Sequence, residues 1–380
     1  MLDQAVRQHT APVKVRDIRL DFFRGLGMFI IFIAHVPNNP WAQFIPARFG
    51  FSDATEIFVF CSGMASALAF GRIFDSHGFF IGTARIAFRC WQVYWSHIGL
   101  FLVVCTSMAA VGRLVGVGDD YVRGIGLDGV FGPDTSSGLL GLMTLTYVPH
   151  YFDILPMYLV ILTLIPLCVV LARRDPRLMF AASIALWLAA SWVPLELRAG
   201  YSRDAVWFFN PFSWQLIFFT GFSLMRGWLP APPVNRAMIA GAIAVLLLAL
   251  PLSWQQGLDA SPVLASWHSA LEPLIDKTHL GSLRFVHFLA LAYLAVIAVG
   301  ERGSRLTGWF VEICRSVGQQ ALATFMTGLT LSFLAGAAFN WTGTGVLAVA
   351  ALNLTGMALM VLAARTVAWF KSTPWAKPAR

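Results

Sequence analysis

Two ionisable residues stand at the ends of one apolar stretch near the start of the chain. The stretch RGLGMFIIFIAH begins with Arg24 and ends with His35, and the ten residues between them carry no charge. At 100° per residue, the two side chains fall within roughly 20° of each other and about 16 Å apart along a helix. Placing a titratable group at such a depth in a membrane is costly, so this spacing predicts a functional site.

A stripe of polar residues leads up to these two positions. Asp17 and Asp21 fall close to the same helical face, which gives a seam running from the inner mouth of the helix toward His35. Lipid would leave each member unpaired, so the seam must face protein or water. Two structural alternatives stay open: an interfacial ion pair between Asp21 and Arg24, and a neutral core histidine bonded to a backbone carbonyl.

Two acidic residues open the next apolar segment. In FGFSDATEIFVFCSG (49–63), Asp53 and Glu56 lie one helical turn apart on one face, at the depth expected for His35. A carboxylate beside an imidazole fixes its tautomer and stabilises the imidazolium, which makes the histidine a better general base. The alternative is structural, because Asp53 as N-cap with Glu56 three residues later also matches a capping box.

Further polar residues complete the predicted site. Asn38 and Asn39 should end the first helix and lie beside the imidazole of His35. The remaining candidates stand at the ends of later segments: Arg85 and Arg89 in an inner loop, His150 and Asp153 at the start of the fourth span, and His287 one turn into the eighth. Simple membrane anchoring is an alternative for Arg85, and ordinary packing is an alternative for His287.

The elements that carry these residues are those of a membrane protein. Of the 380 residues, 58% are hydrophobic and only 12% are charged, which excludes an ordinary soluble domain. The apolar runs are continuous instead of alternating, which excludes a transmembrane barrel. The five cysteines fall singly in apolar stretches and predict no metal site. We therefore expect an all-α integral membrane protein with a single domain over residues 1–380.

About ten transmembrane helices are expected, each an apolar run bounded by polar residues. They are 20–38, 54–74, 90–112, 153–172, 179–196, 212–229, 236–254, 283–300, 317–339 and 344–369. An even number puts both termini on one side, where 20 of the 27 Lys and Arg residues also fall. Segment 1–19 and tail 370–380 are therefore predicted to be cytoplasmic. The net charge of +8 then faces anionic lipid or an anionic substrate, and no nucleic acid is expected as a partner.

Several motifs resemble those of a known family. The run RDIRLDFFRGLGMFIIFIAHVPNN followed by FGFSDATEIFVFCSG is similar to the opening of the OpgC-type membrane succinyltransferases of osmoregulated periplasmic glucans. Arg24 and His35 match an Arg, ten residues and a His that mark the first span in the wider superfamily of polysaccharide acyltransferases. Phe60, Ser62 and Gly63 approximate its second mark. YFDILPMYLVIL, NPFSWQLIFFTGF and LRFVHFLALAYLA extend the similarity, in order, along nearly the whole chain.

The resemblance implies a ten-helix enzyme of the bacterial inner membrane. Such an enzyme takes an acyl group from cytoplasmic acyl-CoA, here succinyl-CoA, and delivers it to a periplasmic glucan, with His35 as the catalytic residue. No permanently bound cofactor is expected, and the partners are acyl-CoA, the glucan and membrane lipid, with homo-oligomerisation left open. The phosphates of CoA should bind to basic side chains at the inner mouth of the first helix, where Arg24, Arg85 and Arg89 are available.

Two other functions stay open. An acetyltransferase acting on another envelope polysaccharide would use the same residues, whereas a glycan or lipid-linked sugar transporter would use the seam as a path. The sequence shows no internal repeat with broken helices, which weighs against a typical transporter. A succinyl donor also needs a cation for its free carboxylate, and the sequence does not say which residue supplies it.

Overall fold

The computed structural model describes residues 17–118, 120–131, 134–193, 195–200 and 205–376. The described chain is helical, and its sole strand-like feature is an isolated bridge between Arg198 and Val206. Its helices are α1 (Arg19–His35), α2 (Ala54–Ser66), α3 (Arg72–Leu114), α4 (Asp120–Gly124), α5 (Thr135–Thr144), α6 (Ile154–Arg174), α7 (Pro176–Trp192), α8 (Pro211–Arg226), α9 (Arg236–Ala249), α10 (Gln255–Ala260), α11 (Pro262–Ile275), α12 (Ser282–Val299), α13 (Trp309–Gln319), α14 (Ala321–Thr342) and α15 (Val346–Lys371).

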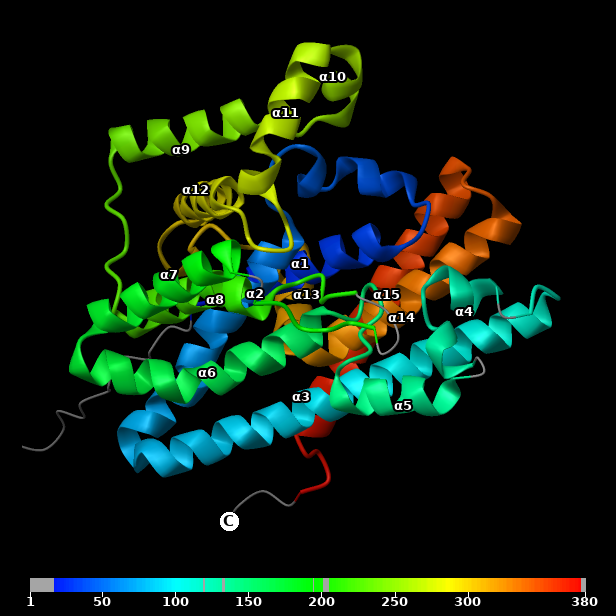
Figure 1. Cartoon of the computed structure of the whole chain (residues 1–380), viewed down its shortest axis with the longest axis horizontal. Helices are drawn as coiled ribbons and strands as arrows, with labels where there is room; N and C mark the ends of the chain where they lie inside the picture. The colour runs from blue at the N-terminus through cyan, green and yellow to red at the C-terminus, as the bar shows by residue number, and fades with distance from the viewer. Residues whose placement is uncertain (1–16, 119, 132–133, 194, 201–204, 377–380) are drawn as a thin grey trace, which may run out of the picture.

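Short helical turns link some of these elements. A π-helical turn, Ala67–Gly71, joins α2 to α3, and 3-10 turns occupy Pro40–Phe44, Pro46–Arg48, Asp128–Val130 and Glu301–Gly303. In Figure 1, α3 runs as one long helix along an edge of the molecule, and α9, α10 and α11 stand apart from the central helices.

The predicted spans coincide with helices. Five helical stretches of the described chain are long and apolar enough to cross a membrane: the continuous run Ala54–Leu114, then α6, α12, α14 and α15. α9 is apolar but shorter. The all-α membrane class is therefore supported, whereas the count of ten crossings and the orientation of the termini stay predictions. Residues 1–16 and 377–380, which belong to the predicted cytoplasmic ends, lie outside the described residues.

The inner loop predicted between the spans 54–74 and 90–112 is wrong in one respect, because this stretch is helical. α3 begins at Arg72 and continues into the third predicted span, broken only at Gly78, where φ is 79° and ψ is −176°. The charged side chains of this stretch suggested a loop. Between Arg72 and Arg89, however, residues that favour helix outnumber the glycines. A helix that extends beyond the membrane can also carry charged side chains. Arg85 and Arg89 consequently lie on a helix.

Pairs of glycines let the central helices touch. A Cβ atom on Gly25 of α1 would lie 1.8 Å from the backbone oxygen of Cys314 in α13, and one on Gly318 would lie 1.9 Å from that of Asp21. Gly63 likewise allows α2 to approach α8 closely, because a Cβ atom on it would lie 2.0 Å from the backbone oxygen of Phe218. Such close approach is typical of helix contacts in membranes, where small residues allow dense packing.

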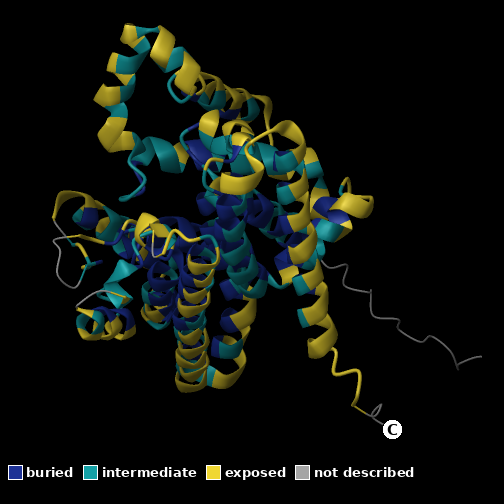
Figure 2. Cartoon of the chain, turned by 90° about the vertical axis from the view of Figure 1, so that its right-hand side faces the viewer, coloured by how far each residue is buried: buried dark blue, intermediate teal, exposed yellow. Residues whose placement is uncertain are grey.

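The core lies where α1, α2, α8, α13 and α14 meet. α8 is buried on nearly every side, and Trp214, Phe218, Phe219 and Phe222 are among its fully buried residues. Figure 2 shows buried residues gathered in the middle of the molecule and exposed residues on the outer helices. Many exposed residues are large and apolar, including Phe80, Trp91 and Leu247, as expected of surfaces that face lipid.

Adding one methyl group at the α2–α8 contact should destabilise the fold. Gly63→Ala forces the two backbones apart, and overpacking of this kind typically costs about 1–3 kcal/mol. The measurement is the thermal unfolding midpoint of the purified protein in detergent. Gly99→Ala is the matched control, because a Cβ on this α3 glycine has open space around it. Equal midpoints for the two variants would contradict the tight α2–α8 contact.

Candidate functional site

His35 is the last residue of α1 and is held by its own helix. Its Nδ1 donates to the backbone oxygen of Ile31 at 2.7 Å, because a carbonyl can only accept. In the neutral ring this leaves the lone pair on Nε2. The imidazole is partly exposed. The carbonyl bond that the sequence left as a structural alternative is thus present, and it presents a basic nitrogen at an accessible position.

The residue against the His35 ring is Tyr151. The two rings meet edge to face with centroids 5.3 Å apart, and Tyr151 in turn meets Phe333 of α14 at 5.6 Å. Tyr151 has a φ of 76°, which a bulky residue rarely adopts. Residues in such conformations cluster at functional sites. The exposed His150 is its neighbour, so the turn before α6 brings polar groups to the end of α1.

Asp53 and Glu56 form a capping box at the start of α2. Thr55 N–H donates to Asp53 Oδ1 at 2.7 Å, and Asp53 N–H donates to Glu56 Oε2 at 2.7 Å. The structural alternative for these acids is therefore confirmed. Neither acid orients His35, because a backbone carbonyl takes the imidazole N–H. Of the two, Asp53 acts on the histidine through its charge.

Two cations from far along the chain neutralise this pair of acids. Arg284 Nη1 donates to Glu56 Oε1 at 2.7 Å, and Lys277 Nζ contacts Asp53 Oδ2 directly. The side chain of Glu56 is completely buried, whereas that of Lys277 is 30% exposed. The charges of Lys277 and Asp53 both act on the His35 imidazole. A four-charge cluster, made of Asp53, Glu56, Lys277 and Arg284, therefore stands beside the catalytic candidate.

Asp53 stays ionised in this cluster. Burial works to raise its pKa, but the positive charges of Lys277 and Arg284 and the hydrogen bonds from Lys277 and Thr55 outweigh burial. The pKa of Asp53 is consequently held well below its ordinary value. Asp53 can serve as a fixed negative charge, and it cannot serve as a proton donor near neutral pH.

The other predicted partners of His35 are engaged elsewhere. Asn39 donates to Asn353 Oδ1 of α15 at 2.8 Å and to the Ile33 oxygen at 3.1 Å, so it locks α15 against the end of α1. Asn38 is exposed with a φ of 59°. No hydrogen bond in the described structure joins either amide to the imidazole, because the chain turns away directly after α1.

His287 contacts the loop that precedes α2. It is buried, its Nδ1 lies 2.7 Å from Ser52 Oγ, and its ring lies 5.8 Å from that of Phe51. A Cβ atom on Gly50 would lie 2.3 Å from His287 Nε2, so only glycine fits there. His287 therefore connects α12 to the segment that carries Asp53.

The polar residues of the seam on α1 contact different partners. Asp17 pairs with Arg19 at 2.6 Å, and Asp21 accepts from Gln319 Nε2 of α13 at 3.2 Å. Arg24 keeps a buried Nε for which the described residues provide no hydrogen-bond partner, although its charge reaches Cys61 of α2. A buried guanidinium N–H without a hydrogen bond costs free energy, and a bound ligand could accept that hydrogen bond.

Arg85 and Arg89 lie apart from this assembly, whereas Asp153 adjoins it, because its carboxyl group accepts a hydrogen bond from the backbone N–H of Tyr151. Arg85 lies over the ring of Phe88, 5.4 Å from its centroid, and Arg89 donates to Gln92 at 3.3 Å, so both contact their own helix. Asp153 is buried and accepts from the Phe208 N–H at 3.1 Å. Among the described residues no cluster of His, Cys, Asp and Glu could hold a metal ion, and the five cysteines are free.

Sequence reasoning missed Lys277, Arg284, Ser52 and Tyr151. Lys277 and Arg284 are among the seven Lys and Arg residues that the charge count leaves on the outer side. Their scarcity there was a usable signal, because two acids at the outer end of one helix require nearby cations.

The chain was compared with known proteins. A family model described as OpgC protein matches residues 16–372, a range that contains every residue of the site. The chain belongs to the OpgC family. Membership of the OpgC family suggests a membrane acyltransferase-like function for glucans. No match was found among curated proteins or among solved structures.

Breaking the buried ion pair should destabilise this OpgC protein strongly. Arg284→Met leaves Glu56 as an uncompensated buried charge, which costs about 3–5 kcal/mol. Adding Glu56→Gln removes that charge and should recover a large part of the loss. The measurement is the free energy of unfolding in detergent.

Arg123→Gln provides the matched control, because Arg123 forms an exposed pair with Asp120 at 4.0 Å and its loss should leave stability nearly unchanged. Strictly additive effects of Arg284→Met and Glu56→Gln would show that the two side chains do not interact.

Proposed function

We propose that this chain is a membrane O-acyltransferase that moves a succinyl group from cytoplasmic succinyl-CoA to sugar hydroxyls of periplasmic glucans. The observation that carries the proposal is the state of His35. Its Nδ1 is occupied by a carbonyl, its Nε2 has a lone pair, and its ring is partly exposed at a junction of three elements. A general base needs this combination of accessibility and a fixed tautomer.

The direct reaction uses His35 as base. Nε2 takes the proton of the sugar hydroxyl while the oxygen attacks the thioester carbonyl. The carbon–sulfur bond then breaks, and the leaving CoA thiolate takes that proton from the imidazolium, which restores neutral His35. In the alternative, Nε2 attacks the thioester carbonyl and the carbon–sulfur bond breaks, which releases the CoA thiolate. The sugar hydroxyl then attacks the acyl-imidazole, the carbon–nitrogen bond breaks, and the hydroxyl proton passes to the thiolate. Trapping an acyl-imidazole with labelled donor in the absence of acceptor would support the second route.

The four-charge cluster supports both routes electrostatically. Asp53 supplies a fixed negative charge that stabilises a positive imidazolium. The partly exposed ammonium of Lys277 is the cation we assign to the free carboxylate of the succinyl group, or to the oxyanion that develops on the thioester. This assignment fills the need for a cation near His35 that the sequence left open.

Arg24 is the residue we assign to the phosphates of the donor. It lies about 16 Å from His35 along α1, a distance that an extended pantetheine arm can cover. Its buried Nε lacks a partner in the described structure. A guanidinium offers phosphate a two-pronged geometry, which suits an anionic donor arriving from the cytoplasm.

Removing the base should abolish transfer. His35→Gln keeps a polar side chain but loses the basic nitrogen, and we expect acyl transfer to fall by about a hundredfold or more. The measurement is mass spectrometry of glucans after incubation with succinyl-CoA or acetyl-CoA, since the mass added per substituent identifies the acyl group. His77→Gln, an exposed histidine on α3, is the control and should transfer normally. Full activity of His35→Gln would contradict the proposal. A preference for acetyl-CoA would identify acetyl-CoA as the donor in place of succinyl-CoA.

Removing the proposed phosphate ligand should weaken donor binding. A hydrogen bond to a charged group is worth about 1.5–3 kcal/mol, so Arg24→Gln should raise the Kd for succinyl-CoA by roughly tenfold or more. The measurement is a titration of purified protein with a non-hydrolysable donor analogue. Arg236→Gln, exposed at the start of α9, should bind as the unmodified chain does. An unchanged Kd for Arg24→Gln would remove Arg24 from this role.

A further inference from the structure

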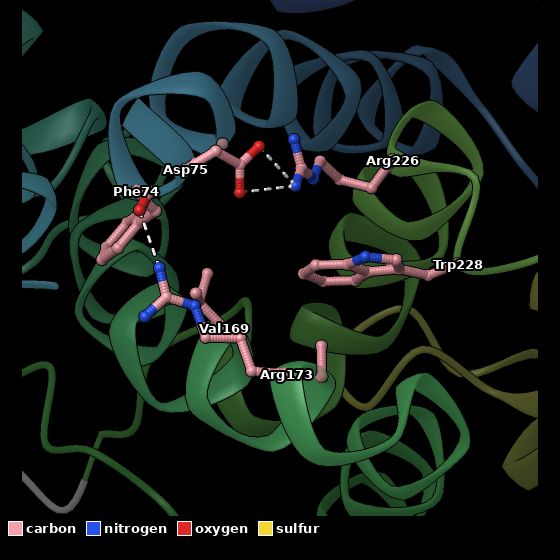
Figure 3. Close-up of a pocket in the computed structure, with 8 residues that line it drawn as sticks. Phe74, Asp75, Val169, Arg173, Arg226 and Trp228 are labelled. Atoms are coloured by element: carbon pink, nitrogen blue, oxygen red, sulfur yellow. Dashed lines mark hydrogen bonds and ion pairs between the residues drawn. The ribbon is translucent and has the colours of Figure 1, made fainter. Parts of the chain in front are cut away.

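A polar pocket opens at the opposite end of the helices from His35. It has a volume of about 160 Å³ and lies between the start of α3 and the ends of α6 and α8. Figure 3 shows Asp75 and Arg226 on one side of the hollow, Val169 and Arg173 on another, and the Trp228 ring facing them. Such a volume is similar to that of cavities that hold a small organic group.

Backbone geometry fixes the arginine on the α8 side. A Cβ atom on Gly71 would lie 2.9 Å from Cδ and Nη1 of Arg226, so glycine is required for the guanidinium to lie where it does. Gly227 has a φ of 71° and ends α8, which turns Trp228 back so that the Arg226 guanidinium lies 5.5 Å from its ring centroid. The pocket wall is therefore built by specific local structure.

The pocket carries an excess positive charge. Arg226 Nη2 donates to both carboxylate oxygens of Asp75, at 2.8 and 3.0 Å, so these two residues neutralise each other. Arg173 donates to the backbone oxygen of Phe74 at 2.7 Å and has no acidic partner among the described residues. The Nε of Arg226 is buried and likewise lacks a hydrogen-bond partner there. Two guanidinium groups thus retain unused donors around a hollow.

We propose that this pocket binds the phosphate group of a phosphate ester. Guanidinium groups match the geometry of phosphate, and one net positive charge matches a phosphodiester. The pocket lies at the end of α6, a helix able to cross a membrane, and beside the π turn that joins α2 to α3. Lipid headgroups lie at that level. The ester is therefore an anionic phospholipid or a phosphate compound dissolved in the adjacent water.

This site is separate from the acyl-transfer site. α2 begins next to the end of α1 that carries His35, and the π turn that follows α2 ends at Gly71 in the pocket wall. The length of α2 and that turn places the pocket roughly 25 Å from the start of α2, which lies beside His35. The inference therefore stands without the proposed function, and His35→Gln should leave phosphate binding unchanged.

The test compares two adjacent arginines in the full chain in detergent. Short-chain phosphatidylglycerol is titrated in one arm and glycerophosphoglycerol, its soluble headgroup diester, in the other, and binding is followed by calorimetry. Arg173→Gln should weaken binding of the relevant probe by tenfold or more. Arg174→Gln removes the same charge one position along α6, outside the pocket, and should bind as the unmodified chain does.

A second pair of variants leaves the charge untouched. Val169→Phe fills the pocket and should abolish binding, whereas Val170→Phe places the same ring on the exposed side of α6. Losses confined to Arg173→Gln and Val169→Phe support the site. Binding of phosphatidylglycerol alone identifies a lipid ligand, and binding of glycerophosphoglycerol identifies a soluble one. Absence of saturable binding of both probes, or equal effects of the paired variants, overturns it.

Discussion

The carboxylate of Glu56 is completely buried, and the chain supplies its cation from 228 positions away, in Arg284. A buried charge without a partner is severely destabilising, so this contact forces the start of α12 against the start of α2. Lys277 on Asp53 and His287 on Ser52 reinforce the same junction. The loop after α1, the capping box of α2 and the segment around Lys277 are consequently brought together beside His35.

That junction explains how one fold serves both stability and chemistry. The acids cap a helix and pair with cations, which are structural tasks, yet they also fix a negative and a positive charge near an imidazole. A preorganised set of charges costs no rearrangement during a reaction. The glycine contacts of α1 with α13 and of α2 with α8 keep the helices close enough for this arrangement.

The fold class could be predicted from the sequence because the thickness of a bilayer fixes the length of the continuous apolar segments that cross it. Helices occur at each predicted span, although the first helix ends at His35, three residues before the predicted end at Asn38. The helical nature of residues 72–89 was missed because charge pattern alone does not separate a loop from a helix that extends beyond the membrane. The family resemblance was also readable, and the match over residues 16–372 confirms it.

The sequence by itself determined that this is a helical membrane protein of the OpgC family with His35 as its central candidate, since these features depend on local spacing and composition. Only the tertiary structure decided which partners meet. It joined Glu56 to Arg284, Asp53 to Lys277 and Asn39 to Asn353. Such pairings depend on how distant segments pack in three dimensions, and helical periodicity carries no information about contacts between residues hundreds of positions apart.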